Sequence, residues 1–183
     1  MLTLAQLKAA MPNTGKRAAI MLAPLNAAMA AADINTRLRI AAFLSQAGHE
    51  SLDFIYMREI ASGAAYEGRK DLGNIQKGDG VRFAGRGPIQ VTGRANYQAF
   101  SDWCGLDCVA TPKLLEDPEN GWLASTWFWM VNHVNQWADK GDIDGVSDVI
   151  NRGRKTVAIG DSNGYEDRLK RYKIALAALK DLP

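Results

Sequence analysis

Residues 36–51 of this 183-residue chain have the sequence TRLRIAAFLSQAGHES, and this stretch decides the fold class. Apolar side chains recur at helical spacing from Leu38 to Leu44, and the small polar residues Asn35 and Thr36 precede them as candidate helix caps. The stretch is therefore predicted to be an amphipathic helix that begins after residue 35 or 36 and runs to the GHE at its end.

Similar helical patterns lie on both sides of this stretch. Pro12 ends the first of them, the pair Asp117 and Pro118 is a strong start for another, and Gly153 ends a third. Together they predict a mainly α chain. The expected helical ranges are 2–10, about 13–31, 94 onward, 118 to about 137, 142 to about 151, and from about 163 through the last apolar stripe at 179.

Residues 62–93 differ from the rest because glycine is frequent and apolar runs are short. This density of glycine predicts loops, with a short hairpin of Val81–Phe83 against Ile89–Val91. Loops that are held by a rigid helical scaffold often carry functional residues. The glycine-rich insert is therefore the first place to look for a site.

The composition narrows the class of protein. The formal net charge is only +2, so the overall charge gives no indication of a nucleic-acid partner. Two cysteines, Cys104 and Cys108, argue against a disulfide framework and favour a reducing compartment. The Ala-rich N-terminal runs are shorter than a membrane span and are interrupted by Lys8, Lys16 and Arg17, so we expect no export signal.

Glutamate is scarce, yet three of the six glutamates, Glu50, Glu59 and Glu67, fall within eighteen residues. Hydrolysis of a glycosidic bond uses two carboxyl groups, and the inverting route needs them roughly 6.5–9.5 Å apart to admit a water. Two glutamates nine residues apart with a helix end between them can span that distance. Spacing alone is a weak indication, because carboxylates near a helix end are more often surface charges.

Four ordered blocks strengthen the indication. They are FLSQAGHES at 43–51, REI at 58–60, YEGRKDLGN at 66–74 and GDGVRFAGRGPIQVTGRANY at 78–97. These blocks resemble the catalytic core of glycoside hydrolase family 19 and are most similar to its phage and prophage endolysin branch. The resemblance covers about residues 36–100, with weaker similarity at 149–151 and in the last helix. It implies a lysozyme-like, two-lobed helical fold with the glycine-rich insert beside a cleft.

The resemblance also implies roles for individual residues. Glu50 matches the general acid of the family, and Glu59 matches the general base that activates water, with inversion at the anomeric carbon. Thr92 stands where the family has a Ser or Thr that helps to hold this water. The residues implied to line the glycan site are Gln90, Asn96 and Tyr97 on the sugar-binding floor, and Asn151 and Arg168, which are implied to reach back towards the carboxylates.

Elementary electrostatics gives expectations for the two carboxylates. Glu50 ends an apolar helix, and partial burial there would favour its protonated form. Glu59 adjoins Arg58, whose charge would favour the ionised form. His49 is expected to orient Glu50 or nearby backbone and is counted with the glycan-site residues.

Glu67 is the third carboxylate of the cluster and is also counted with the glycan-site residues. It could pair with Arg69, Arg82 or Arg86 and so tie down the glycine-rich loop. The alternative is that Glu67, and not Glu59, is the second catalytic group. We favour the structural role, because the family pattern places the base at residue 59.

Other chemistries fit the sequence less well. A zinc site of the HExxH type needs a histidine at position 53, which is Asp53, so we expect neither metal nor cofactor. Nothing around the two cysteines indicates an activated thiol. The tryptophans between 122 and 137 and His133 are expected in the core. Lys170, Arg171 and Lys173 of the last helix are expected on a solvated face, with weak contact to the cell envelope as the alternative.

The sequence therefore predicts a single catalytic domain, residues 1–183, with core motifs at 36–100 and a helical remainder at 101–183. It is expected to act as a monomeric endolysin that hydrolyses β-1,4 bonds of peptidoglycan glycan strands. We expect it to be made in the host bacterial cytoplasm and to reach the wall after membrane permeabilisation by a separate partner. The alternatives are a chitinase, a lytic transglycosylase and an inactive glycan-binding module.

Overall fold

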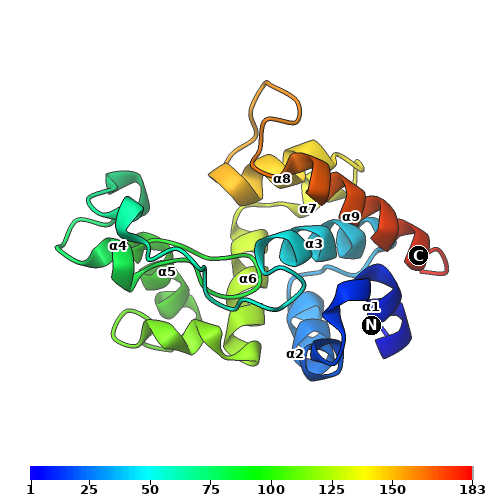
Figure 1. The fold of residues 1–183 in the computed structure, drawn as a ribbon, viewed down its shortest axis with the longest axis horizontal. Helices are drawn as coiled ribbons and strands as arrows, with labels where there is room; N and C mark the ends of the chain where they lie inside the picture. Colours follow the sequence, from blue (N-terminus) through cyan, green and yellow to red (C-terminus); the bar gives the residue numbers. More distant parts are fainter. Residues whose placement is uncertain (183) are drawn as a thin grey trace.

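The computed structural model describes residues 1–182 and consists mainly of helices arranged around a central helix, α3 (Figure 1). The elements in chain order are α1 (Leu4–Ala10), η1 (Pro12–Thr14), α2 (Arg17–Ala31), α3 (Arg37–Glu50), η2 (Ala64–Tyr66), η3 (Lys70–Leu72), α4 (Asp79–Arg82), α5 (Arg94–Cys104), η4 (Pro112–Glu116), α6 (Pro118–Val131), α7 (Asn135–Ala138), α8 (Ile143–Arg152) and α9 (Tyr165–Ala178). The expectation of a mainly α chain is confirmed.

Helix α3 is buried on all sides over residues 40–48 because other helices cover it. The Thr36 side chain caps its first turn by accepting from the Arg39 amide at 3.3 Å. Phe43 then packs edge-on against Trp129 of α6 with ring centroids 5.2 Å apart. The core therefore fixes the direction of α3, and its last residues emerge at the surface.

Helix α6 ends earlier than the sequence predicts. It stops at Val131, and His133 takes a left-handed conformation with φ of 52° before the short α7 begins. The expectation of one helix to residue 137 is therefore wrong, and so is the expectation of a core position for His133, which is exposed. Of the four tryptophans expected in the core, Trp122, Trp127 and Trp129 are buried, and Trp137 is half-buried.

The predicted hairpin in the glycine-rich insert is also wrong. Val81 and Arg82 belong to the helical turn α4, and Phe83 caps its end. A turn of helix forms here because the Glu67 carboxylate accepts hydrogen bonds from two amides, those of residues 78 and 80, at its start. The insert makes isolated antiparallel bridges instead, in which Arg86 pairs with Val91 and with Arg58.

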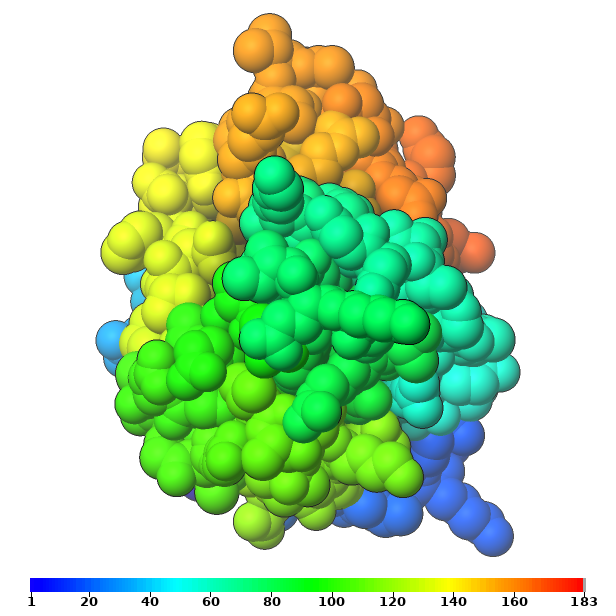
Figure 2. Space-filling view, turned by 90° about the vertical axis from the view of Figure 1, so that its left-hand side faces the viewer, coloured from blue at the N-terminus to red at the C-terminus, as the bar shows by residue number. Residues whose placement is uncertain are grey.

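The helices form two groups in Figure 1. Helices α4 and α5 and the loops around them lie on the left, and α1, α2, α7, α8 and α9 surround α3 on the right, with α6 between the groups. Figure 2 views the molecule from the left, and residues of about 60–110 cover the middle of that face, with the 153–162 loop above them. In the part of the chain that the structure describes, no helix is long and apolar enough to cross a membrane.

Candidate active site

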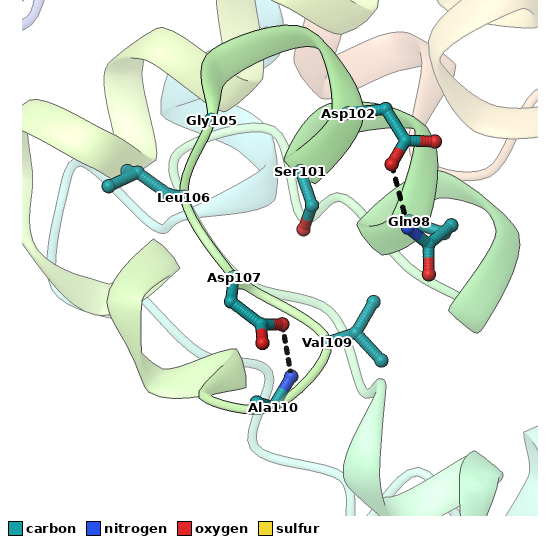
Figure 3. Close-up of a pocket in the computed structure, with 8 residues that line it drawn as sticks. All are labelled: Gln98, Ser101, Asp102, Gly105, Leu106, Asp107, Val109 and Ala110. Carbon is teal, nitrogen blue, oxygen red and sulfur yellow. Dashed lines mark hydrogen bonds between the residues drawn. The ribbon is translucent and has the colours of Figure 1, made fainter.

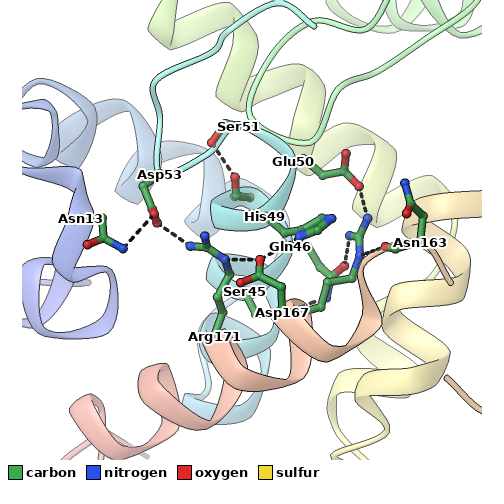
Figure 4. A network of polar contacts seen from close by, with 12 residues as sticks. Asn13, Ser45, Gln46, His49, Glu50, Ser51, Asp53, Asn163, Asp167 and Arg171 are labelled. Carbon is green, nitrogen blue, oxygen red and sulfur yellow. Dashed lines mark hydrogen bonds and ion pairs between the residues drawn. The ribbon is translucent and has the colours of Figure 1, made fainter. Parts of the chain in front are cut away.

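Glu50 is the last residue of α3 and meets a guanidinium from α9. Its Oε1 atom accepts from Arg168 Nη2, and the Arg168 side chain is 1% exposed while that of Glu50 is 20% exposed. The Arg168 guanidinium also donates to Gln46 Oε1 at 2.5 Å and to the Asn163 carbonyl at 3.0 Å. Arg168 is therefore fixed on three sides, and the predicted acid is held in a defined orientation (Figure 4).

These contacts change the expected surroundings of Glu50. An apolar environment was expected from the helix that precedes it, whereas the structure places a buried cation on one carboxylate oxygen. Arg168 belongs to α9, which crosses α3 (Figure 1), so nothing in the local sequence of α3 indicates the pair. The expectation that Arg168 reaches back towards the carboxylates agrees with its position.

Glu59 is held by two neutral donors in the loop region. Its Oε1 accepts from the Gly85 amide at 3.0 Å and its Oε2 from the Tyr66 hydroxyl at 2.9 Å. The Glu59 amide in turn donates to the Gly85 carbonyl at 3.0 Å. These donors, and not the neighbouring Arg58 of the sequence-based expectation, are the recorded partners of the Glu59 carboxylate. Its orientation is thus fixed by hydrogen bonds.

Tyr66 keeps its proton in this position. Burial, the hydrogen bond to Glu59 and the charge of Glu59 raise the pKa of Tyr66 to about 12, and the charge of Glu50 adds to the rise. Arg69 acts in the opposite direction. The hydroxyl therefore stays a donor over the whole neutral range, and it experiences the charge of both glutamates.

Thr92 also lies beside Gly85. A β-carbon added to Gly85 would stand 3.1 Å from Thr92 Oγ1 and 3.0 Å from Gln90 Oε1. The Thr92 hydroxyl donates to the Gln90 carbonyl at 2.8 Å, so its oxygen keeps lone pairs for another partner. The structure thus brings Glu59, Thr92 and Gln90 together around one glycine.

Gln90 is held in an uncommon backbone conformation, with φ of 58°. Its side-chain nitrogen, Nε2, donates to the Gly87 carbonyl at 2.8 Å, while its buried side-chain oxygen, Oε1, has no partner among the described residues. A buried amide oxygen without a partner is uncommon in folded proteins, and a ligand can reach this one only if the side chain turns outward. Of the residues that the sequence assigned to the sugar-binding floor, Gln90 is the one that lies beside Gly85, whose amide binds Glu59.

Glu67 lies in the same loop region but has a different role. Both carboxylate oxygens accept backbone hydrogen bonds, from the Gly78 amide at 2.6 Å and from the Gly80 amide at 2.9 Å. The expected pairing with Arg69, Arg82 or Arg86 does not occur, since those guanidinium groups bind other oxygens. Glu67 ties down the loop, as favoured, but through the amides at the start of α4.

His49 binds α9 and does not bind Glu50. Its Nδ1 atom lies 2.8 Å from Asp167 Oδ2, and Gly164 packs so closely on the imidazole ring that a β-carbon there would overlap it. The recorded side-chain contact of His49 is with Asp167, so the expectation that His49 orients Glu50 or nearby backbone is wrong. The histidine fixes the last turn of α3 against the start of α9.

The remaining predicted residues are divided between core and surface. Tyr97 is fully buried, with its hydroxyl donating to the Ala84 carbonyl at 2.9 Å, so its placement on the sugar-binding floor is wrong. Asn96 is half-buried and donates to the Thr92 carbonyl at 2.8 Å, which supports the turn that carries Thr92. Asn151 is exposed and accepts from the Asn163 amide at 3.1 Å, next to the carbonyl that binds Arg168.

The chain between the two glutamates is strained. Leu52, Asp53 and Phe54 are consecutive residues with φ of 48°, 57° and 65°, a left-handed conformation that costs non-glycine residues roughly 1–2 kcal/mol each. Burial of Phe54 edge-on against Trp122, with centroids 5.2 Å apart, and hydrogen bonds to Asp53 offset this cost. The turn redirects the chain so that Glu59 returns beside the insert.

The arrangement can support acid and base catalysis by two carboxylates. One is at a helix end on a buried cation, and the other is on a loop between neutral donors. Distinct surroundings for two carboxyl groups are what a division of labour between acid and base requires.

A family model described as Chitinase class I, the model of glycoside hydrolase family 19, matches residues 17–149. The chain belongs to glycoside hydrolase family 19. The matched range contains both glutamates, Thr92 and the whole glycine-rich insert. The family that the sequence blocks resemble is thereby confirmed, and the chain is a glycoside hydrolase.

Individual family 19 relatives agree with this assignment. A Haemophilus influenzae protein named as a glycosyl hydrolase family 19 domain-containing protein is 25% identical over 176 residues, covering 79% of this chain and 82% of that protein. Chitinase 11 of Oryza sativa subsp. japonica is 30% identical over 161 residues, covering 77% of this chain and 62% of the rice protein. The chain therefore spans most of the bacterial relative but less than two thirds of the rice enzyme.

Solved structures of the family share the fold. The class IV chitinase of Zea mays matches with a TM-score of 0.68 and 26% identity over 94% of this chain and 85% of that one. Chitinase C from Streptomyces griseus matches with a TM-score of 0.72 and 23% identity, covering 97% and 76% of the two chains. The predicted lysozyme-like helical fold is confirmed.

The family 19 site includes residues that the sequence analysis missed. Tyr66 and Gly85 hold Glu59, Gln46 holds Arg168, and Asp167 holds His49. Gln46 lies one turn before Glu50 on α3, so helical spacing could have indicated it. No local pattern marks the others, because loops and a second helix bring them to the site.

A separate pocket of about 530 Å³ lies at the end of α5 in this family 19 enzyme, and it contains none of the predicted site residues (Figure 3). Its polar side chains are already paired, since Gln98 donates to Asp102 at 2.8 Å and Asp107 accepts from the Ala110 amide at 2.8 Å. We therefore place the site at the two glutamates on the grounds of chemistry.

Proposed function

We propose that the protein is an endolysin that hydrolyses β-1,4 glycosidic bonds of bacterial peptidoglycan with inversion, using Glu50 as general acid and Glu59 as general base. The observation that carries the proposal is a pair of carboxylates held in fixed orientations, Glu50 by Arg168 and Glu59 by two neutral donors. The choice of Glu50 as acid and Glu59 as base follows the family pattern at these two positions and not these contacts. Membership of glycoside hydrolase family 19 supports the reaction class.

In the proposed reaction, Glu50 gives its proton to the leaving glycosidic oxygen while Glu59 takes a proton from the attacking water. Glu59 accepts one hydrogen bond on each oxygen, which leaves lone pairs for the water. The Thr92 hydroxyl, which lies beside Gly85, is the second group for this water in the proposal. Gln90, whose side chain also lies beside Gly85, is proposed to bind the sugar.

The proposed setting is host lysis by a phage. The similarity of the blocks at 43–51 and 78–97 to the endolysin branch supports a peptidoglycan glycan strand as substrate. On this proposal, the protein is made in the bacterial cytoplasm and acts on the wall as a monomer after a separate partner has permeabilised the membrane. Envelope contact through α9 is left to Lys170 and Lys173, since Arg171 is half-buried and paired.

Chitin is the second candidate substrate. The relatives from rice and the matching structures from maize and Streptomyces griseus are named chitinases. Chitin and the peptidoglycan glycan strand share β-1,4 linkages between N-acetylated sugars, so the same carboxylate pair suits both. The choice between them depends on the sugar-binding residues.

One assay separates the candidates. The protein is incubated with purified peptidoglycan and with chitin oligomers, and new reducing ends and product masses are measured. We expect new reducing ends from peptidoglycan only. Activity on chitin alone would overturn the endolysin proposal, and a product that ends in an anhydro-sugar would indicate a lytic transglycosylase. Lack of activity on either polymer would favour a glycan-binding module.

The proposed setting has its own test. Purified protein is added to Gram-negative cells that are either intact or permeabilised with chloroform, and the fall in turbidity is followed. We expect rapid lysis of the permeabilised cells and little lysis of intact cells. Equal lysis of both would show that the protein crosses the envelope unaided, and the separate partner would then be unnecessary.

A further inference from the structure

Arg171 on α9 lies between two carboxylates that belong to different parts of the site (Figure 4). Its Nε donates to Asp167 Oδ2 at 2.6 Å and its Nη1 donates to Asp53 Oδ1 at 2.6 Å. Asp53 is 3% exposed, and the Arg171 side chain is 18% exposed. One planar guanidinium therefore joins two acidic groups with fixed geometry.

The first contact leads to Glu50. Asp167 Oδ2, which accepts from Arg171, also lies 2.8 Å from His49 Nδ1, and His49 directly precedes Glu50. Asp167 likewise directly precedes Arg168, which binds Glu50. Two neighbouring pairs thus join the end of α3 to the start of α9.

The second contact leads to Glu59. Asp53 is the middle residue of the left-handed turn that redirects the chain after α3. Its side chain also accepts from Asn13 Nδ2 at 3.3 Å, and its carbonyl accepts from Arg17 Nε at 3.1 Å. Glu59 follows Asp53 by six residues. The conformation of this turn therefore sets the direction of the chain that carries Glu59 towards the insert.

We propose that Arg171 is a positioning residue that sets the separation of Glu50 and Glu59. It contacts neither carboxylate. It holds the end of α3 through Asp167 and the strained turn through Asp53, and so it fixes both carboxylate-bearing segments to one helix. Acid and base catalysis depends steeply on such placement, because a shift of about 1 Å can lower the rate of turnover on the order of a hundredfold.

The packing around Arg171 is specific to its shape. A β-carbon added to Gly48 would stand 3.0 Å from Arg171 Nη1 and 3.4 Å from Asp53 Oδ1, so a glycine at this position of α3 makes room for the pair. A lysine has a single ammonium and cannot reproduce the two-pronged contact. The arrangement therefore requires an arginine, and a positive charge alone is insufficient.

The proposal rests on Glu50 and Glu59 being the catalytic pair, and the experiment includes both. Variants Arg171→Met, Arg171→Lys, Glu50→Gln and Glu59→Gln are assayed for kcat and KM on soluble peptidoglycan fragments and on soluble chitin oligomers. Arg39→Met is the matched control, because it breaks another two-pronged arginine contact, the pair of Arg39 with Asp139, at the opposite end of α3 from Glu50. Folding of each variant is checked by circular dichroism.

We expect Arg171→Met to lower kcat at least about tenfold with KM within about threefold, since Arg171 does not reach the glycan. Arg171→Lys should lose most of the same kcat, and Arg39→Met should keep kcat within about twofold. A wild-type kcat in Arg171→Met or Arg171→Lys would overturn the positioning role. A loss of equal size in Arg39→Met would also overturn it, because the effect would then be general to α3.

Two further variants keep the test valid if Arg171→Met fails to fold. Asp53→Asn and Asp167→Asn keep the side-chain shape, and asparagine tolerates the left-handed turn. Each should lower kcat, and the double variant should lose less than the product of the two single losses, because both act through one guanidinium. Independent multiplication of the losses would overturn the proposal. If Glu50→Gln and Glu59→Gln keep turnover, the proposed function and the positioning role both fail.

Discussion

The two glutamates of this family 19 enzyme are held by opposite means. The region of α3 and α9 holds Glu50 with the buried cation Arg168, and the adjacent Asp167 pairs separately with Arg171 and with His49. The insert holds Glu59 with a tyrosine hydroxyl and a backbone amide. One carboxylate is thus placed by charge on helices and the other by neutral donors on loops.

Backbone packing replaces side-chain packing in the insert. A β-carbon on Gly80 would stand 2.5 Å from the Glu67 amide nitrogen, and one on Gly63 would stand 2.5 Å from the Gly80 carbonyl oxygen. Glycine is required at such close approaches of two backbones. The insert therefore reaches a defined shape with few large apolar side chains, which explains how a loop can hold a carboxylate as firmly as a helix does.

The largest expected effects come from removing either carboxylate. If both regions serve one reaction, Glu50→Gln and Glu59→Gln should each lower kcat about a thousandfold or more, while thermal stability stays nearly unchanged. Reducing-end release and melting temperature are the measurements. A large loss in only one of the two variants would break the comparison, because it would leave one region without a catalytic role.

Glu67→Gln is the matched control within the insert. Its carboxylate holds two amides of the loop, so the variant should lose roughly 1–2 kcal/mol of unfolding free energy and keep kcat within about threefold. The opposite pattern, an inactive Glu67→Gln beside an active Glu59→Gln, would reassign the base to residue 67.

A buried carboxylate of the insert, Asp79, pairs with Arg94 at the start of α5, and removing it gives the next largest effect. Asp79 is 1% exposed, and its carboxylate receives Arg94 at 2.5 Å and 2.9 Å. Asp79→Asn should lower the free energy of unfolding by about 3 kcal/mol, because it leaves a charge partly buried without its partner. Asp71→Asn, in the exposed pair with Arg69, should leave the melting temperature unchanged.

The stabilisation by the pair of Asp79 and Arg94 should weaken as the pH falls. The hydrogen bond from Arg94 is the largest cause that lowers the pKa of Asp79 below its ordinary value of 3.8, while burial acts in the opposite direction. The stabilisation is therefore present above pH 3.8 and is lost as pH falls through the depressed value. Chemical denaturation at pH 7 and at pH 3 should show a smaller gap between wild type and Asp79→Asn at pH 3. An equal difference in unfolding free energy at the two pH values would mean that the ion pair does not cause the loss of stability in Asp79→Asn.

Several helix starts were predictable from sequence because their causes are local. Thr36, Asp117 and Asp142 all cap helices where the sequence indicates, each with an amide of its own first turn as partner. The blocks around Glu50 and Glu59 are contiguous in sequence, so the resemblance could locate both. Features that depend on residues close together in sequence can therefore be recognised from the sequence.

The errors have long-range causes. Tyr97 lies at a helical position in a recognised block, but only the packing of Phe83 and Arg86 against it decides that it is buried. The contact from Arg171 to Asp53 joins residues 118 apart in sequence, and no periodicity indicates it. The end of α6 at Val131 has no glycine or proline to mark it, so the aromatic pattern continued past the real end.

Tyr66→Phe should have a smaller effect on kcat. It tests whether a neutral hydrogen-bond donor helps to position the Glu59 carboxylate. It removes one hydrogen bond to the Glu59 carboxylate, and a bond to a charged group contributes about 1.5–3 kcal/mol. Because the Gly85 amide still holds the other oxygen, we expect kcat to fall only about tenfold, with KM nearly unchanged. Wild-type kcat in this variant would show that the backbone alone positions Glu59.

The smallest expected effect is on stability at alkaline pH, and it also comes from the Tyr66 hydroxyl. Tyr66 has a folded-state pKa of about 12, mainly through burial and the bond to Glu59, against an ordinary value of 10.0. A raised pKa means that the stabilisation is complete below pH 10 and is lost as pH rises towards 12, because the unfolded chain ionises first. Melting temperature measured from pH 8 to 11 should therefore fall less steeply in Tyr66→Phe than in wild type. Tyr97→Phe should flatten the same curve, since burial also raises the pKa of Tyr97 to about 12. A wild-type slope in Tyr66→Phe would mean that this hydroxyl is as free to ionise in the folded insert as in the unfolded chain, and the insert would then hold Glu59 less firmly than the helices hold Glu50.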